Sequence, residues 1–235
     1  MYLGVDEAGK GPVLGPMVAA AVLADPESLP DDVDDSKRLS PARREAIDAE
    51  IRDSDGVALG VAFVTPDEID RPDTDMNTLT VSGQARAARI ALSGVVATDI
   101  DEPIRAVADA GDTSEERFAS RLSEFIETGD DSDDGFVDLP AVDVEAAHGA
   151  DEDDPIVGAA SVVAKVARDA RMSAIDARYP DYGGAGSGYP SDPTTRSFLR
   201  EYVADRGQVP DCARRSWATC DDVLAAAEQS GLDEF

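Results

Sequence analysis

The sequence predicts an α/β fold, in which helices pack against the faces of a mixed sheet of five strands. Three observations support this prediction: three strand-like segments come early, strand-like and helical segments alternate after them, and the chain closes with two helical segments. No internal repeat or linker separates two domains. We therefore expect residues 1–178 to form the main domain and residues 179–235 to pack on it within a single structural unit.

The five strands are predicted from short apolar runs between turn signals. The second run, VLGPMVAAAVLA, contains residues small and apolar enough for the centre of a sheet. We expect it to form a hairpin with the first strand. The strands are expected at residues 2–6, 12–23, 56–64, 104–110 and 141–147.

The helices are predicted from their start signals and their apolar periodicity. The expected N-caps are Ser40, Thr113 or Ser114, and Asp154. Proline follows at the first helical position after the first and last of these caps, where its missing N–H costs nothing. The helices are expected at residues 41–52, near 66, and at 77–92, 114–127, 155–179, 194–205 and 217–229. The acidic stretch at 128–140 is expected to be a mobile, solvated insertion.

Length and composition indicate a globular protein with one substantial core. The chain has 235 residues, of which 42% are hydrophobic. No apolar run approaches the length of a membrane span, and the start MYLGVDE has neither a basic region nor a cleavable apolar segment. We therefore expect a cytoplasmic protein that does not bind membranes. The spacing of Cys212 and Cys220 fits no zinc motif, and we expect two free thiols.

The charge of the chain is strongly negative and unevenly distributed. The 50 acidic and 21 basic residues give a net charge of −29, and only three of the basic residues are lysines. Such a chain repels itself at low ionic strength and is screened in concentrated salt, which favours a halophilic cytosol. Residues 155–215 are the exception, with nine Lys or Arg against seven Asp or Glu. If the protein binds a polyanion, we expect it to bind to this region. The alternative explanation of the basic residues is that they form a solvated helix face.

Four acidic residues are distinguished by their positions at predicted strand ends. Asp6 and Glu7 end the first strand, Asp109 ends the fourth, and Asp151 follows the fifth. Neighbouring side chains of a regular strand point to opposite faces, so we expect the chain to turn at Ala8-Gly9, which lets both carboxylates face one site. Grouped carboxylates repel one another unless divalent cations neutralise them. Their oxygen atoms suit Mg²⁺ or Mn²⁺, and two such ions about 4 Å apart promote attack of water on a phosphodiester.

Seven segments form an ordered set of motifs over nearly the whole chain. They are GVDEAGKGPVLGPMV (4–18), DSKRLSPARR (35–44), MNTLT (76–80), VADAGD (107–112), HGADEDDPIVGAASVVAKVARD (148–169), GSGYPSDPTTRSFL (186–199) and RRSWAT (214–219). Together they resemble type 2 ribonuclease H in its archaeal form. The resemblance implies a ribonuclease H-like fold with a helical C-terminal extension.

The resemblance also implies an activity and its partners. The expected reaction is endonucleolytic hydrolysis of the RNA strand of RNA/DNA hybrids, and cleavage at ribonucleotides embedded in duplex DNA, leaving a 3′-hydroxyl and a 5′-phosphate. This activity belongs to ribonucleotide excision repair and DNA replication. We expect a monomer, and the sequence leaves open whether a sliding clamp is a partner.

The site residues implied by the resemblance fall into two groups. The expected catalytic residues, which would also bind two divalent ions, are Asp6, Glu7, Asp109 and Asp151. The expected substrate-binding residues are Gly9, Lys10, Gly11, Ser36, Lys37 and Tyr189. The glycines let the backbone approach the ribonucleotide, the tyrosine stacks at the ribose, and the Ser-Lys pair contacts the phosphate backbone. The 2′-hydroxyl is the group by which such a site distinguishes RNA from DNA.

Several assignments stay open at this point. His148, Ser161 and Lys165 have both a functional and a purely structural interpretation, and the core is the better expectation for Trp217. A lysine is common before the fourth carboxylate in the family, where this chain has Gly149, so we expect fewer salt-sensitive phosphate contacts. Two alternative functions are another ribonuclease H-like metal-dependent nuclease acting on DNA lesions or junctions, and a noncatalytic nucleic-acid-binding module.

Overall fold

The structure is a computed structural model, and it describes the chain except for residues 31–32, 34–38, 96–101, 130–138 and 233–235. The chain divides into two compact units. The first comprises Met1–Ala8, Val18–Phe63 and Met76–Ala167, and the second comprises Gly9–Met17, Val64–Asp75 and Arg168–Phe235. Gly9–Met17 and Val64–Asp75 thus group with the C-terminal part of the chain. The expected division after residue 178 would place both segments in the main domain, and that division stays a prediction. Most of the acidic stretch at 128–140 lies outside the described residues.

The first unit is built on a mixed five-stranded sheet. Its strands are β1 (Tyr2–Ala8), β2 (Met17–Ala24), β3 (Ala58–Val64), β4 (Ile104–Asp109) and β5 (Val142–Ala147). They lie in the order β3-β2-β1-β4-β5. β1 is antiparallel to β2 and parallel to β4, which is in turn parallel to β5. The predicted mixed sheet and its first hairpin are confirmed.

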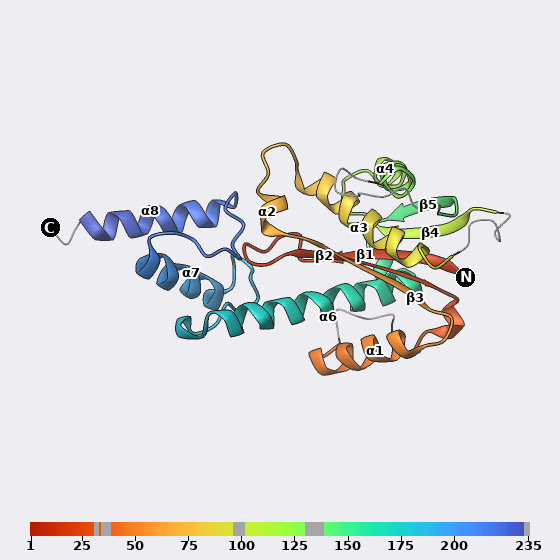
Figure 1. Ribbon diagram of the computed structural model, residues 1–235, viewed down its shortest axis with the longest axis horizontal. Helices are drawn as coiled ribbons and strands as arrows, with labels where there is room; N and C mark the ends of the chain where they lie inside the picture. The colour runs from red at the N-terminus through yellow and green to blue at the C-terminus, as the bar shows by residue number, and fades with distance from the viewer. Residues whose placement is uncertain (31–32, 34–38, 96–101, 130–138, 233–235) are drawn as a thin grey trace. The chain divides into compact units, whose positions relative to one another are not determined.

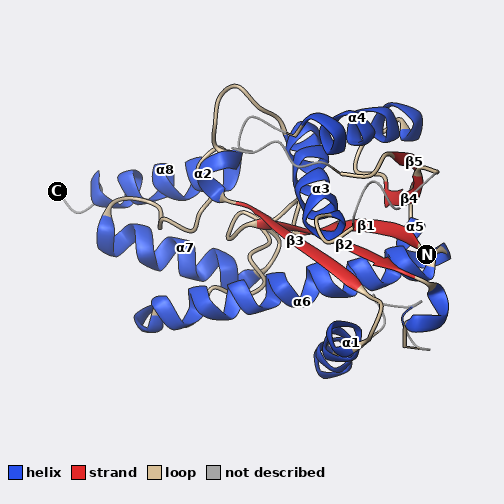
Figure 2. Ribbon diagram, turned by 45° about the vertical axis from the view of Figure 1, so that its right-hand side comes forward, coloured by secondary structure: helices blue, strands red, loops and turns tan. Residues whose placement is uncertain are grey.

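Helices cover both faces of this sheet. α3 (Met76–Leu92) and α4 (Glu115–Thr128) pack on one face, and α1 (Pro41–Asp53) and the start of α6 (Pro155–Arg178) pack on the other (Figures 1 and 2). β2 alternates between the two cores: Ala19, Ala21 and Leu23 join the first, and Ala20, Val22 and Ala24 join the second. Because both of its faces are buried, β2 is apolar at every position.

Helix starts follow the predicted caps. Ser40 accepts a hydrogen bond from the Arg43 N–H at the start of α1, and Ser114 caps α4 in the same way. Asp154 accepts from two backbone N–H groups at the start of α6 and also from the Tyr2 hydroxyl at 2.9 Å. Among its described residues, the first unit also has the short α5 (Ala150–Asp153) and the 3₁₀ turn Pro26–Ser28. The sequence did not predict α5.

The second unit is mainly helical. It contains the end of α6, α2 (Pro66–Ile69), α7 (Pro193–Arg206), α8 (Ala218–Leu232) and a 3₁₀ turn at Pro180–Tyr182. β2 starts at Met17 rather than at residue 12, because the preceding residues pair within this unit: the Val13 N–H donates to the Gly188 carbonyl at 2.8 Å, and Leu14 bridges Ala213.

The core of the second unit includes both cysteines. Cys212 and Cys220 are buried free thiols, as predicted. Burial raises the pKa of the Cys212 thiol to about 12 and that of the Cys220 thiol to about 11. Across the described part of the chain, no helix combines the length and the apolar character needed to cross a membrane.

Candidate active site

Three acidic residues lie at one edge of the sheet in the first unit. Val5 pairs with Ala108 in the parallel β1–β4 ladder, so Asp6 and Asp109 follow at the same level of two adjacent strands. The carboxylate of Asp109 accepts a hydrogen bond from the Ala150 N–H at 2.9 Å, which attaches α5 to the end of β4. Asp151 is the next residue of α5. The structure therefore brings Asp6, Asp109 and the helical turn that carries Asp151 to one edge, as the strand ends predicted.

Asp6 is the most buried of the acidic residues at this edge, with 4% of its surface exposed. Burial raises its pKa well above the ordinary value, and the neighbouring carboxylates of Glu7 and Asp109 raise it further. A hydrogen bond with Ser161 of α6 and one from the Glu7 N–H at 2.7 Å oppose this shift. Ser161 thus contacts the acidic edge directly, through its hydrogen bond with Asp6. A buried carboxylate beside two others is costly without a cation, and this environment is typical of a functional site.

Asp6 and Glu7 have partners on opposite faces of the sheet. Asp6 bonds to Ser161 of α6, whereas Glu7 accepts from the Gln84 side chain of α3 at 2.7 Å. β1 ends at Ala8 and Gly9 follows with φ +89°, so the chain breaks at Ala8-Gly9 as expected, while the regular alternation of side chains continues up to that point. The roles assigned to the two carboxylates stay predictions.

Gln84 is a site residue that the sequence did not reveal. It is fully buried, and its amide group donates to both Glu7 Oε2 at 2.7 Å and the Asp109 carbonyl at 3.0 Å. It therefore joins the end of β1 to the end of β4. Gly111 lies beside Glu7, where an added Cβ would lie 2.6 Å from Thr80 Cγ2 and 3.4 Å from Glu7 Oε1. One sequence signal could have indicated Gln84: it is a long amide side chain among the small residues of a helix with a wide apolar face, and a buried amide needs hydrogen-bond partners.

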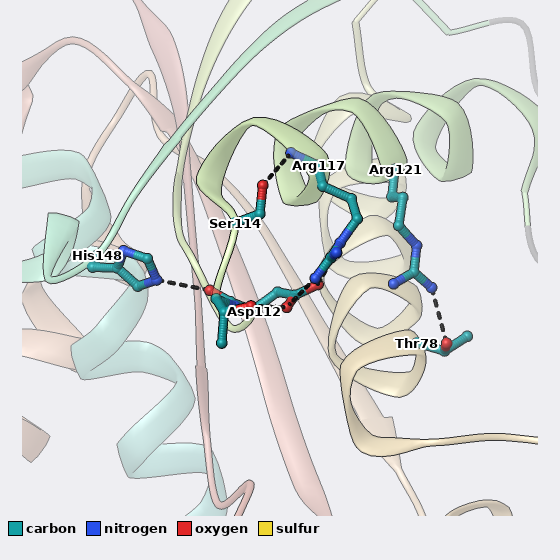
Figure 3. A network of polar contacts seen from close by, with 7 residues as sticks. Thr78, Asp112, Ser114, Arg117, Arg121 and His148 are labelled. Carbon is teal, nitrogen blue, oxygen red and sulfur yellow. Dashed lines mark hydrogen bonds and ion pairs between the residues drawn. The ribbon is translucent and has the colours of Figure 1, made fainter.

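His148 belongs to a polar network beside the acidic edge (Figure 3). Its Nε2 donates to the Asp112 carbonyl at 2.7 Å, and its Nδ1 lies 2.9 Å from Glu115 Oε1. The hydrogen bond to Asp112 raises the pKa of His148, and Glu115 adds to this effect. The Asp112 side chain pairs with Arg117 at 2.7 Å, which lowers the pKa of Asp112. These contacts hold the β4–α4 connection against the end of β5. They show a structural contribution of His148, and a functional role stays a prediction.

The predicted ribonucleotide-binding residues that the structure describes gather in the second unit. Gly9 has φ +89°, and an added Cβ would lie 2.3 Å from Arg168 Nε, so only glycine fits there. Gly11 lies close to the Tyr189 ring, which is 41% exposed. The Arg168 guanidinium lies 5.6 Å from the centroid of the same ring. Lys10 lies between the two glycines.

Ser36 and Lys37 lie outside the described residues, so their expected phosphate contacts stay predictions. Lys165 is partly buried on α6 in the first unit. Trp217 is partly buried against the core of the second unit, as expected, but it also contacts the glycine loop, because its indole N–H donates to the Gly11 carbonyl at 3.2 Å.

The donors at the acidic edge suit a hard divalent ion. Within the described residues, no three His, Cys, Asp or Glu side chains are grouped closely enough to enclose a metal ion. Mg²⁺ is commonly bound through one or two carboxylates together with water and substrate phosphate oxygens, so a closed cage of protein ligands is not required. Asp6, buried beside Glu7 and Asp109 with its pKa raised, provides the charge that such an ion would neutralise. The donor chemistry therefore fits Mg²⁺ or Mn²⁺.

The sheet order and the acidic strand ends define a nuclease of the ribonuclease H type. The family model for ribonuclease HII matches residues 3–220. The chain belongs to the ribonuclease HII family, and the protein is a ribonuclease H endonuclease.

Similar proteins cover the chain over almost its full length. The ribonuclease HII of Haloarcula marismortui is 53% identical over 239 residues, covering all of both chains. The crystal structure of ribonuclease H2 from Pyrococcus horikoshii OT3 has a TM-score of 0.77 and 33% identity, covering 97% of this chain and 98% of its own. The ribonuclease HII of Archaeoglobus fulgidus, solved in complex with PCNA, has a TM-score of 0.74 and 34% identity, covering 92% and 95%.

Proposed function

We propose that this protein hydrolyses the RNA strand of RNA/DNA hybrids and cleaves duplex DNA at embedded ribonucleotides, leaving a 3′-hydroxyl and a 5′-phosphate. The observation that carries the proposal is the acidic edge of the sheet, where Asp6 is buried beside Glu7 and Asp109. Such a group of carboxylates has no structural benefit on its own, because mutual repulsion and burial both disfavour it. It is explained by a need to hold cations next to a phosphodiester.

The catalytic group of this proposal is Asp6, Glu7, Asp109 and Asp151, which would hold two divalent ions, Mg²⁺ or Mn²⁺. When bound, such ions lower the pKa of water and stabilise charge on the phosphate oxygens. The chain's own residues set the positions of the donors. The Ala150 N–H fixes the Asp109 carboxylate, the Ser161 hydroxyl and the Glu7 N–H fix Asp6, and the Gln84 amide fixes Glu7.

Recognition of the ribonucleotide is assigned to the second unit, to Gly9, Lys10, Gly11 and Tyr189. Close approach of the glycine backbone supports this assignment, because Gly9 leaves no space for a side chain and Gly11 borders the exposed tyrosine ring. A ring exposed beside a bare backbone is suited to stacking on a sugar while N–H donors reach its 2′-hydroxyl. Ser36 and Lys37 are proposed to contact the phosphate backbone of the substrate.

The biological setting follows from the substrate. We propose a role in ribonucleotide excision repair and DNA replication, in the cytoplasm of a halophilic cell, by a monomer. The high negative charge supports the halophilic setting, since it is tolerated when salt screens it. The complex of the Archaeoglobus fulgidus relative with PCNA supports a sliding clamp as a protein partner.

The experiment compares matched DNA duplexes that differ in one nucleotide. One strand carries a single ribonucleotide in the first duplex and none in the second, and each is incubated with and without Mg²⁺ or Mn²⁺. We expect metal-dependent cleavage of the first duplex alone. Equal cleavage of both would instead indicate a nuclease for DNA lesions or junctions.

The Asp109→Asn variant tests whether the acidic edge performs the chemistry. Asn keeps the size of the side chain and an oxygen acceptor for the Ala150 N–H but removes the charge. We expect cleavage to be lost while the circular dichroism spectrum and the melting temperature are retained. Undiminished cleavage by this variant would remove Asp109 from the catalytic group.

A further inference from the structure

One buried arginine holds the backbone of the glycine loop in the second unit. Arg214 is fully buried, and its guanidinium donates to the carbonyl oxygens of Gly9 at 2.6 Å, Lys10 at 2.9 Å and Gly15 at 3.0 Å. The planar guanidinium presents five N–H donors in a fixed geometry, and a lysine ammonium cannot reproduce this arrangement. Arg214 therefore fixes the orientation of three peptide groups at once.

Trp217 completes the contact with the loop. Its ring lies against the guanidinium of Arg214, 5.1 Å from ring centroid to Cζ, and its indole N–H donates to the Gly11 carbonyl at 3.2 Å. The carbonyl groups of Gly9, Lys10 and Gly11 are thus all bound by these two side chains. The next residue is a proline and has no N–H to donate.

The bound carbonyl groups determine where the loop's N–H groups point. All peptide bonds of the described residues are trans, and in a trans peptide the C=O and N–H groups point in opposite directions. The Gly9 carbonyl shares its peptide with the Lys10 N–H, and the Lys10 carbonyl shares its peptide with the Gly11 N–H. Because both carbonyls point to Arg214, both N–H groups point to the opposite side of the loop.

The segment that carries Arg214 is itself anchored within the second unit. The Arg214 N–H donates to the Val13 carbonyl at 2.8 Å, and the Asp70 carboxylate accepts from the next two backbone N–H groups at 2.7 and 2.9 Å. The guanidinium therefore has little freedom to move when the loop moves. This arrangement is expected of a group that holds the loop in place before a ligand arrives.

The arrangement is costly, which argues against a role in stability alone. Arg168 is also buried, with 2% of its surface exposed, and its guanidinium packs against Gly9 and the Tyr189 ring. Burial lowers the pKa of Arg214 to about 9, and the positive charge of Arg168 contributes to this. Two buried guanidinium groups of like charge disfavour the folded state, so a functional advantage has to offset that cost.

We infer that Arg214 and Trp217 are positioning residues for ribonucleotide selection, which orient the Lys10 and Gly11 N–H groups towards the sugar before the substrate binds. The inference rests on the proposed function, which assigns the loop to the ribonucleotide, and adds the residues that set its shape. Neither residue needs to touch the substrate. Preorganised N–H donors distinguish a ribose from a deoxyribose, because only the ribose has a 2′-hydroxyl that can accept their hydrogen bonds.

The test measures discrimination rather than activity alone. The kcat/KM is determined for a duplex with one ribonucleotide, and the matched all-DNA duplex is used as a competitive inhibitor to give its Ki. Arg214→Lys removes the planar fork, and Trp217→Phe keeps an aromatic ring but removes the indole N–H. Arg215→Lys is the matched control, because the exposed Arg215 side chain lies next in the chain and its only role in the anchoring is through its backbone N–H.

We expect Arg214→Lys to lower kcat/KM for the ribonucleotide duplex by about tenfold or more, as is typical of lost hydrogen bonds from a charged donor, with the all-DNA Ki unchanged. Trp217→Phe is expected to act in the same direction with a smaller loss, and Arg215→Lys to change neither constant. Trp217 is the chain's single tryptophan, so its emission should shift in Arg214→Lys before any substrate is added.

The outcomes separate this inference from the proposed function. If the wild-type enzyme does not prefer the ribonucleotide duplex, the proposed function fails. If the wild type prefers it and Arg214→Lys retains that preference, or loses affinity for both duplexes equally, the positioning role is refuted alone. If Arg214→Lys does not fold, Trp217→Phe decides by the same criterion.

Discussion

Replacing Gln84 by methionine tests how the acidic edge is held. Methionine has nearly the same length and volume but cannot donate to Glu7 or to the Asp109 carbonyl. The substitution therefore removes the link between the ends of β1 and β4 without leaving a large cavity. We expect activity to fall much more than stability.

The magnitudes follow from the contacts of Gln84. The bond to the Glu7 carboxylate contributes about 1.5–3 kcal/mol and the bond to the Asp109 carbonyl about 1 kcal/mol. Opposing this loss, Gln84 Oε1 is buried and has no hydrogen-bond partner among the described residues, and relieving such a group returns about 1–3 kcal/mol. The net loss in the free energy of unfolding should thus be no more than about 3 kcal/mol. Activity should fall about 10- to 100-fold, as when the residues that orient metal-binding side chains are lost.

The assay combines kcat and KM on a duplex with one ribonucleotide, their dependence on Mg²⁺ concentration, and urea unfolding. Gln84→Glu is the companion variant, because it keeps the length but places a further carboxylate against Glu7, and we expect it to be less active than Gln84→Met. Wild-type kcat/KM in Gln84→Met, or higher activity in Gln84→Glu than in Gln84→Met, would show that Gln84 does not orient the site.

Three further predictions concern other parts of the chain. Affinity for an RNA/DNA hybrid should depend on salt with a logarithmic slope shallower than about −5, because few phosphate contacts are expected; a salt titration with a slope near −10 would contradict this. Asp192→Ala should destabilise the fold by about 1 kcal/mol, since Asp192 caps α7 and accepts from Ser187. These hydrogen bonds lower the pKa of Asp192 to about 2. Its contribution to the free energy of unfolding should therefore be complete above about pH 4 and should be lost as the pH falls towards 2. Urea unfolding at several pH values measures this dependence. Cys212 and Cys220 should react with a thiol reagent only after denaturation, because burial raises the pKa of both thiols; labelling of the native protein would refute this.

Much of the fold could be predicted because local signals and tertiary structure agree. The cap at Ser40, the cap at Asp154 and the apolar run of β2 each act within a few residues, and the structure uses all three. The grouping of Asp6 with Asp109 was predictable for a related reason, since parallel strands end at the same edge of a sheet.

The errors have a common cause, which is pairing with distant parts of the chain. Val13 and Leu14 have strand-like sequence, but their partners near Gly188 and Ala213 lie far along the chain and draw them out of β2. Gln84 and Arg214 were missed because their partners are backbone and side-chain groups about 25 to 205 positions away, which no local pattern encodes.

A single residue, Ala8, separates the last acidic residue of β1 from the first glycine of the loop that Arg214 holds. Engineering by fragment exchange would therefore have almost no crossover point between the proposed catalytic carboxylates and the proposed ribonucleotide-binding loop. The proposed reaction chemistry and the proposed sugar preference should consequently be inherited together.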